Sequence, residues 1–242
     1  AASDVFKRQV QELESVVGAG KFCEVYGMTE TRPVITLNPA SHFKEAHVGI
    51  PLPGTDVRIA DAEDGNIPMP LGEAGEIIAA GPQIMQGYWQ RPEESSSTLQ
   101  DGWLYTGDVA QVDHDGYFTI VDRKKDMILV SGFNVYPNEV EEQIAAATGV
   151  LEVGVIGIPD EKSGEKVRAY VVTSQPAPSA GDILAHCREH MAAYKVPQQV
   201  IFVDELPKSP IGKILRRKLR AAALAGEITE TKPIDRIDKD GN

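Results

Sequence analysis

Residues 101–137, DGWLYTGDVAQVDHDGYFTIVDRKKDMILVSGFNVYP, mark the point at which the sequence changes its pattern. Short apolar runs between Gly and Pro turns precede this stretch and predict short β-strands. The residues after it alternate between helical and strand-like apolar patterns. Acidic and basic side chains cluster at turn positions within the stretch itself. A two-domain protein would place both its hinge and its active site at such a crossover.

The composition is that of a soluble chain, with 42% hydrophobic and 25% charged residues among 242. The formal net charge of −12 argues against nucleic-acid binding, because phosphate contacts require clustered Lys and Arg. Cys23 and Cys187 are far apart in the sequence, which predicts a reducing cytosol and no disulfide framework. No run of 18 apolar residues occurs, so no membrane span is predicted. The chain begins at Ala1 without Met or a signal pattern, so we expect a piece of a longer protein.

The first residues predict a helix and then a strand that leads into polar side chains. The apolar spacing predicts an amphipathic helix over residues 3–17, and an apolar strand follows at 22–26. Gly27, Thr29 and Glu30 come directly after this strand. A strand end that carries a hydroxyl and a carboxylate is a common ligand-site geometry. A capping threonine beside a solvated glutamate is the structural alternative.

Residues 34–122 predict an antiparallel sheet or a distorted barrel. Asp-Gly steps between β-type runs are strong hairpin signals. The clearest predicted strands are 34–37, 57–60, 76–79 and 117–121.

A compact α+β domain is predicted from Pro137 onward, in the order α-β-β-α-β. Asn138 and Glu141 fit a capping box for its first helix, and Asp182 is the expected cap of its second. The predicted strands are 153–158, 167–172 and 200–203, followed by a basic helix over 213–225 and a loose tail over 226–242.

Asp108 and Arg123 are candidate ligand-binding residues. Asp108 follows Thr106-Gly107 and is predicted to lie in a turn, where a carboxylate is a good acceptor for paired sugar hydroxyls. Arg123 ends a predicted strand, where it could bind the same ribose or hold the carboxylate. A purely structural Asp–Arg pair is the alternative.

Two lysines stand out by their positions. Lys125, within a Lys-Lys-Asp run at the change of pattern, is the candidate hinge, although such runs are commonly solvated charges. Lys213 ends the loop PKSPIGK, and its long stem suits a cation that reaches a phosphate or carboxylate oxygen. A lysine in a helix-entry turn is the alternative. His186 and His190 have the spacing of a metal pair but lack companion ligands, which favours ordinary surface histidines.

Five stretches, taken in order, resemble the adenylate-forming superfamily of acyl-CoA synthetases, luciferases and peptide-synthetase adenylation domains. Residues 101–125 are also similar to the fatty-acyl-CoA synthetase motif, and residues 122–139 resemble bacterial long-chain fatty-acid–CoA ligases in particular. Tyr105 departs from the pattern, which more often has a basic residue there. The five stretches are YGMTE (26–30), GEIIAAGPQIMQGYW (75–89), YTGD (105–108), DRKKDMI (122–128) and PKSPIGK (207–213).

The resemblance implies an α/β and α+β fold in two parts. Residues 1–124 would be the C-terminal portion of a large adenylation domain, with a strand-rich, distorted β-barrel. Residues 125–225 would be a small, mobile α+β lid domain, and 226–242 a loose tail. The family's phosphate loop and most of its acyl pocket lie upstream of the YGMTE stretch, so we expect this chain alone to be inactive.

The implied function is ATP-dependent activation of a long-chain fatty acid to an acyl-adenylate and then to an acyl-CoA. ATP, Mg²⁺ and coenzyme A are the implied cofactors and co-substrates. For the nucleotide and its metal ion, the resemblance implies that Tyr26 and Gly27 bind the nucleotide, with Tyr26 on adenine, that Thr29 contacts the α-phosphate, that Glu30 binds Mg²⁺, and that Asp108 and Arg123 bind the ribose. It implies that Gly132 lies on the pantetheine path and that Lys125 is the hinge. It also implies that Lys213 bridges carboxylate and phosphate during adenylation.

Two other functions stay open. One is a ligase for aryl or medium-chain acids, and the other is a non-catalytic nucleotide-binding or interaction domain of the same fold. Intact Glu30, Asp108, Arg123 and Lys213 argue against the second. The implied partners are fatty acid, ATP and CoA, without nucleic acid, in a cytoplasmic protein. A homodimer and a peripheral position on the inner face of the membrane stay open as well.

Overall fold

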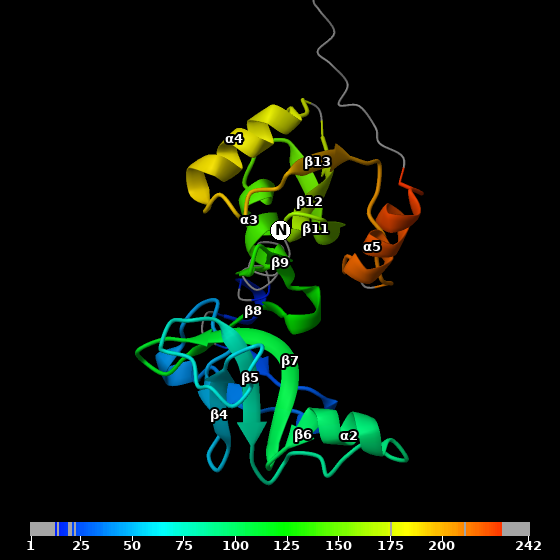
Figure 1. Cartoon of the computed structure of the whole chain (residues 1–242). Coiled ribbons are helices and arrows are strands. Elements are labelled where there is room, and N and C mark those ends of the chain that lie inside the picture. The colour runs from blue at the N-terminus through cyan, green and yellow to red at the C-terminus, as the bar shows by residue number, and fades with distance from the viewer. Residues whose placement is uncertain are drawn as a thin grey trace, which may run out of the picture. The chain divides into compact units, whose positions relative to one another are not determined.

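The computed structural model describes residues 13, 15–18, 21, 23–174, 176–210 and 212–228. Most of the helix predicted over 3–17, and the predicted tail beyond 228, lie outside the described residues. The described chain forms two compact units, one that ends at Lys125 and one that begins at Asp126 (Figure 1).

The first unit is a set of antiparallel strands with short helical turns. Its five-stranded sheet has the order β4-β5-β7-β6, and β8 also pairs with β7. A smaller sheet, β1-β2-β3, continues to β8 through a bridge between Gly49 and Phe118, so the strands form one curled surface. The elements are β1 (Val25–Tyr26), η1 (Thr29–Thr31), β2 (Thr36–Leu37), η2 (Ala40–His42), β3 (Ile50–Pro51), β4 (Asp56–Ala60), β5 (Gly75–Ala80), α2 (Pro92–Thr98), β6 (Leu99–Gln100), β7 (Trp103–Val112), β8 (Phe118–Arg123) and η3 (Lys124–Asp126).

The core of the first unit lies on the inner face of this curled sheet. Ile77 and Ala79 of β5 point inward two residues apart, as the period of a β-strand requires. They pack with Ile35, Ile59 and Phe118, all at most 4% exposed. Burial of such side chains stabilises the unit by roughly 1.5–3 kcal/mol each. The apolar runs that predicted strands therefore do supply the core.

One prediction in this unit is wrong. Asp108 does not lie in a turn between strands but inside β7, a ten-residue strand. The Thr106-Gly107-Asp108 step is a bulge, because Glu76 of β5 pairs with Val109 whereas Ile78, two residues on, pairs with Tyr105. Gly107 adopts φ 72°, which glycine accepts without steric cost, and pairing resumes on both sides. The Thr106-Gly107-Asp108 step, which predicted a turn, therefore forms a bulge within one continuous strand.

The second unit is a three-layered α/β arrangement. Its sheet has the order β10-β9-β12-β11, and β13 pairs in parallel with β12 while the other pairs are antiparallel. The elements are β9 (Ile128–Val130), β10 (Phe133–Val135), α3 (Pro137–Ala145), β11 (Val150–Asp160), β12 (Gly164–Thr173), α4 (Ala180–His190), β13 (Gln199–Phe202) and α5 (Arg216–Ala225).

Helices cover both faces of this sheet, with α3 and α4 on one face and α5 on the other (Figure 1). Val153 and Val155 of β11 face α3 and α4, whereas Ile156 and Ile158 belong to the cluster around Leu219 of α5. This alternation is the period of a strand that is buried on both faces. The strand-rich α/β fold class is therefore confirmed. None of the helices in the described part of the chain has the length and apolar character needed to cross a membrane.

Three helix starts differ from the predictions. The N-cap of α3 is Tyr136, and Asn138 accepts a hydrogen bond from Arg216 instead of capping the helix. The N-cap of α4 is Ser179, whose hydroxyl accepts from the backbone N–H of Asp182. Asp182 is therefore the third residue of a capping box rather than the cap. The last helix, α5, begins at Arg216, so Lys213 lies in the loop before it.

Candidate functional site

Three candidate nucleotide-binding residues meet at the end of the β7–β8 hairpin. The hydroxyl of Tyr26 donates to Oδ2 of Asp108 at 2.8 Å, and Nε of Arg123 lies 3.2 Å from Oδ1 of Asp108. Asp108 and Arg123 are directly paired across β7 and β8, which explains their contact. The Asp108 side chain is only 12% exposed. A carboxylate offers about four lone-pair positions, so it keeps acceptors for two further hydroxyl donors.

The environment of Tyr26 keeps its hydroxyl protonated. Burial raises the pKa of Tyr26 far above its usual range, and the nearby negative charge of Asp108 raises it further. The phenol therefore acts as a hydrogen-bond donor and holds the carboxylate of Asp108 in one orientation. Arg123, whose side chain is 49% exposed, remains accessible beside it.

The loop after β1 places Thr29 and Glu30 by a cap that involves a different threonine. Thr31 is fully buried, and its Oγ1 accepts from the N–H of Met28 at 2.9 Å. Thr29 is exposed and takes no part in this cap. Gly27 is required by close packing, because a Cβ at this position would lie 1.7 Å from the carbonyl oxygen of Pro33. Thr31 therefore caps the turn, and the side chain of Thr29 is left exposed.

Glu30 is half-buried and held by a tyrosine. The hydroxyl of Tyr88 donates to Oε1 of Glu30 at 2.8 Å, so the glutamate is not simply solvated. Burial raises the pKa of Tyr88, and its hydrogen bond to Glu30 raises it further. Among the described residues, no cation forms an ion pair with Glu30. Its second oxygen therefore has no positive partner within this part of the protein.

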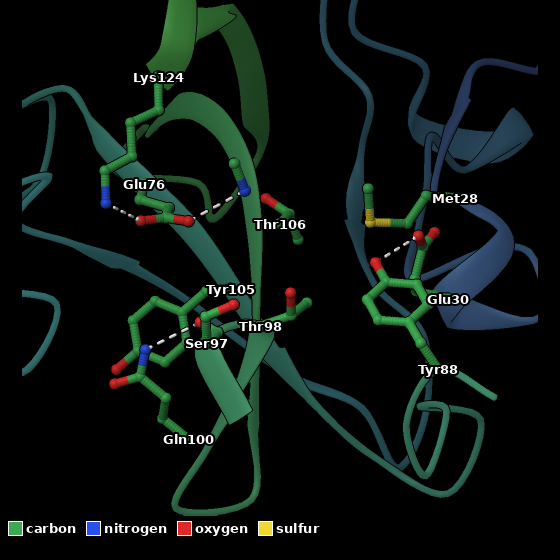
Figure 2. Close-up of a pocket in the computed structure, with 11 residues that line it drawn as sticks. Met28, Glu30, Glu76, Tyr88, Ser97, Thr98, Gln100, Tyr105, Thr106 and Lys124 are labelled. Atoms are coloured by element: carbon green, nitrogen blue, oxygen red, sulfur yellow. Dashed lines mark hydrogen bonds and ion pairs between the residues drawn. The ribbon is translucent and has the colours of Figure 1, made fainter. Parts of the chain in front are cut away.

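A pocket of about 370 Å³ separates Glu30 from the bulge of β7 (Figure 2). Met28, Glu30 and Tyr88 form one wall. The opposite wall contains Glu76, Lys124, Tyr105, Thr106, Ser97, Thr98 and Gln100, and Gly107 also lines the pocket. The walls carry two carboxylates, one ammonium group and several hydroxyls, so the pocket suits a polar, charged ligand.

Glu76 occupies the buried end of this pocket. Its side chain is 3% exposed, and Oε2 lies 2.7 Å from Nζ of Lys124. Oε1 accepts a hydrogen bond from the N–H of Gly107 at 2.9 Å. The adjacent hydroxyl of Thr106 donates to the carbonyl oxygen of Ile77 at 2.7 Å. These bonds fix the bulge that carries Asp108.

Lys213 lies on a tight loop in the second unit. Its N–H donates to Oγ of Ser209 at 3.1 Å, and its carbonyl accepts from the N–H of Ser209 at 2.8 Å. Gly212 has φ 81°, which permits the reversal of the chain. Lys208 in the same loop is 2.6 Å from Glu152, whereas Lys213 is exposed and forms no ion pair among the described residues. The backbone is fixed and the ammonium group is available.

Gly132 and Lys125 occupy exposed positions. Ser131 and Gly132 have φ 51° and 84°, which makes them the two central residues of the β9–β10 turn. Lys125 is the exposed central residue of η3. Tyr26, Asp108, Arg123 and Glu30 are thus gathered in the first unit, while Gly132 and Lys213 belong to the second. The roles assigned to all of these residues stay predictions.

Sequence reasoning missed four residues of these networks. Glu76 and Tyr88 line the pocket, and Glu141 and Arg216 form an ion pair in the second unit, but none of the four was predicted as a site residue. Glu76 does carry a signal, because it is a charged residue in a strand that is otherwise buried, and such groups require a partner. Nothing local to Tyr88 indicates that it contacts Glu30, 58 residues away.

The sequence matches profiles of two families. That of the AMP-binding enzymes matches residues 2–89, and that of the AMP-binding enzyme C-terminal domain matches residues 139–213. The chain belongs to the adenylate-forming superfamily of AMP-binding enzymes.

Individual relatives share close to half of the aligned residues. A long-chain-fatty-acid–CoA ligase from Yersinia pestis is 51% identical over 218 residues, which are 89% of this chain and 38% of the relative. A feruloyl-CoA synthase from Amycolatopsis is 46% identical over 202 residues, which are 82% of this chain and 41% of the relative. The ATP-bound structure of MatB from Rhodopseudomonas palustris aligns with a TM-score of 0.76 and 39% identity, over 85% of this chain and 41% of that one. The chain therefore spans about two fifths of the length of these proteins.

Proposed function

We propose that this chain is part of an enzyme that activates a carboxylic acid with ATP and transfers the acyl group to coenzyme A. The observation that carries the proposal is the arrangement of Asp108, held by Tyr26 and Arg123, beside a separate carboxylate, Glu30. The carboxylate of Asp108 offers acceptors to two hydroxyls of a ribose. Glu30 offers a carboxylate without a positive partner among the described residues. This combination suits a nucleotide with its metal ion.

In the first half-reaction, a carboxylate oxygen of the acid attacks the α-phosphorus of ATP. A new P–O bond forms, the bond to the β-phosphate oxygen breaks, and pyrophosphate leaves with its electron pair. Two anions must approach, so the reaction requires cations and positioning more than a general base. Lys213 has the exposed ammonium group for this role, and Thr29 has an exposed hydroxyl for a phosphate oxygen.

Glu30 suits Mg²⁺ that is bound together with a nucleotide. The described residues contain no group of three or more His, Cys, Asp or Glu side chains placed to hold a metal. Mg²⁺ commonly binds through one or two carboxylates plus substrate phosphates, so a single glutamate fits the ion. When bound, the ion supplies positive charge to the phosphates of the nucleotide. Tyr88 holds Glu30 in place for this contact.

In the second half-reaction, the CoA thiol attacks the acyl carbonyl and AMP leaves. A C–S bond forms, the acyl–phosphate bond breaks, and the thiol proton is released. Lys213 is needed only in the first step, so rotation of the second unit about Lys125 can remove it. We assign residues 125–225 to this mobile lid and 1–124 to the larger domain. Gly132 at its exposed β9–β10 turn would then line the path of the pantetheine.

A long-chain fatty acid is the acid that we propose, because the Yersinia pestis relative carries that name. The feruloyl-CoA synthase supports an aryl acid as the second candidate. A panel of long-chain, medium-chain and aryl acids, assayed with the full-length protein that carries this chain, separates the two. A preference for ferulate-like acids would contradict our choice. We place the enzyme in the cytoplasm, and co-sedimentation with vesicles tests a peripheral position on the membrane.

Isotope exchange between pyrophosphate and ATP tests the activity itself. We expect acid-dependent exchange by the full-length protein, and its absence would favour a non-catalytic domain of the same fold. The 242-residue chain lacks counterparts of about three fifths of the relatives' length, so we expect no acyl-CoA from it alone. Acyl-CoA formation by the purified chain, with ATP and CoA supplied, would refute this expectation.

A further inference from the structure

The residues on either side of Lys125 are each held by an ion pair inside their own unit. Lys124, on the N-terminal side, is bound to Glu76 of the first unit. Asp126, on the C-terminal side, lies 3.6 Å from Nη1 of Arg216 of the second unit. Lys125 itself is exposed between them. Lys125 therefore lies between a residue anchored in the first unit and a residue anchored in the second.

The ion pair on the N-terminal side also reaches the nucleotide-binding residues. Glu76 bonds both to Nζ of Lys124 and to the N–H of Gly107, the neighbour of Asp108 (Figure 2). A buried carboxylate with two charge-assisted or backbone partners is held more firmly than an exposed one. Through Glu76, the side chain next to the hinge is tied to the bulge that carries Asp108.

The ion pair on the C-terminal side forms part of a larger network around Arg216. Its Nε and Nη2 bind the two oxygens of Glu141 at 2.9 and 2.6 Å, a bidentate contact. Nη2 also donates to Asn138 of α3. Glu141 accepts a further bond from the N–H of Val155 in β11 at 2.9 Å. The side chains of Arg216 and Glu141 are 15% and 8% exposed, so solvent weakens this network little.

Arg216 follows Lys213 by three residues and begins α5. The N–H of Leu215 donates to the carbonyl of Pro207, and Lys208 and Ile214 form a β-bridge across the base of the loop. The loop that carries Lys213 is therefore closed on itself and joined to Arg216. Arg216 therefore connects Asp126 to the base of the loop that carries Lys213.

We propose that Glu76 and Arg216 are positioning residues that confine the domain rotation to Lys125 and transmit it to Asp108 and Lys213, respectively. This inference rests on the proposed function. It adds two residues that need not touch any substrate. It predicts that loss of the Glu76 pair affects both half-reactions, because Asp108 serves both steps, whereas loss of the Arg216 pair affects only the first, which Lys213 serves.

The first test is Arg216→Lys in the full-length enzyme, with both half-reactions measured. A lysine keeps one positive charge but cannot form the bidentate contact. We expect pyrophosphate exchange to fall by about 10²-fold, the loss that a displacement of about 1 Å can cause. Thioester formation from supplied acyl-adenylate is expected to persist. Glu141→Gln attacks the same contact from α3 and should give the same split if Arg216→Lys folds poorly.

The second test is Glu76→Gln, which keeps an acceptor for Gly107 but removes the charge that holds Lys124. Both half-reactions should fall together, by about tenfold, and the KM for ATP should rise. Lys124→Met removes the other partner and should give the same pattern. A loss confined to one half-reaction would overturn the role assigned to Glu76.

Arg220→Met is the matched control, because Arg220 lies one turn further along α5 and pairs with Glu165 at 2.6 Å. It loses an ion pair of the same helix without touching Asp126, so both half-reactions should stay unchanged. Equal losses in Arg216→Lys and Arg220→Met, or a parallel fall of both half-reactions in Arg216→Lys, would overturn the proposal. Absence of both activities from the unmodified enzyme would instead count against the proposed function.

Discussion

The two units of this protein hold their candidate functional residues in opposite ways. In the first unit, Tyr26, Asp108 and Arg123 are joined through their side chains, and Glu30 is held by Tyr88. In the second unit, the backbone around Lys213 is fixed by Ser209 while the lysine side chain is exposed. The first unit fixes the side chains of its acceptors, whereas the second fixes the backbone of Lys213 and leaves its side chain exposed.

This difference shows how the proposed reaction can be divided. Acceptors for a sugar and a metal ion are most effective when they do not reorganise as the ligand binds. A cation that is needed in one step and absent in the next is best carried by a long side chain without an ion-pair partner, on a backbone that is held in place. The hydrogen bonds that hold Asp108 and Glu30, and the exposed side chain of Lys213, thus fit the proposed role of each residue.

Among the substitutions that test this difference between the units, Lys213→Ala has the largest expected effect, which is on the rate of adenylation. Without the ammonium group, adenylation by the full-length enzyme should fall by about 10²- to 10³-fold, as for the loss of one preorganised charge donor. Thioester formation from supplied acyl-adenylate should survive. Single-turnover assays of each half-reaction measure both. Lys208→Ala is the control from the same loop, since Lys208 is paired with Glu152, and equal loss of both steps in Lys213→Ala would count against the assigned role.

Asp108→Asn tests the fixed acceptors of the first unit. An amide is neutral and loses part of the acceptor capacity, so the KM for ATP should rise and both half-reactions should fall by about 10- to 100-fold. Steady-state kinetics with varied ATP measure the change. Asp113→Asn, at the other end of the β7–β8 hairpin, provides the control. An unchanged KM for ATP in Asp108→Asn would remove Asp108 from the ribose site.

Lys125→Pro tests whether the two units must rotate against each other. Proline restricts φ at the proposed hinge, so acyl-CoA formation should fall several-fold while pyrophosphate exchange is retained. Lys125→Ala removes the same side chain without restricting the backbone and should leave both steps near normal. If the proline variant turns over at the normal rate, the hinge lies at another residue.

Asp113→Asn gives the smallest expected effect, which is on stability. Burial opposes ionisation, but hydrogen bonds from Lys44 and from the N–H groups of Tyr117 and Asp115 outweigh it and lower the pKa of Asp113 to about 2. The lowered pKa means that the ionised form stabilises the fold above the usual value near 3.8 and that this contribution is lost as the pH falls toward 2.

Urea unfolding of the 242-residue chain at pH 7 and at acidic pH measures this contribution. The variant should be less stable than the parent at pH 7, and the gap should close as the pH falls below the usual aspartate range. A gap that stays constant across this range would show that the contacts of Asp113 do not depend on its charge. The change should leave the functional comparison between the two units intact.

Local sequence patterns predicted the strands better than they predicted the helix caps. Short apolar runs predicted β5 and β11, and an alternating run predicted β12, all close to their observed positions, because each pattern lies within the strand itself. The caps of α3 and α4 were placed wrongly. Asn138 is used by Arg216 from a distant segment, and the periodicity of the chain carries no sign of that contact.

The sequence by itself determined the order of the five family stretches, the change of pattern across residues 101–137, and the identity of most candidate site residues. Only the tertiary structure decided which side chains touch, including those of residues that were not candidates. Tyr26 reaches Asp108 across 82 residues, Glu76 reaches Lys124 across 48, and Arg216 reaches Glu141 across 75. The first two contacts depend on strand register, including the bulge at Gly107 that positions Asp108, and the third depends on how α5 and α3 pack on the second sheet. Register is settled by packing of the whole sheet, whereas periodicity and turn chemistry act only on neighbours in the chain.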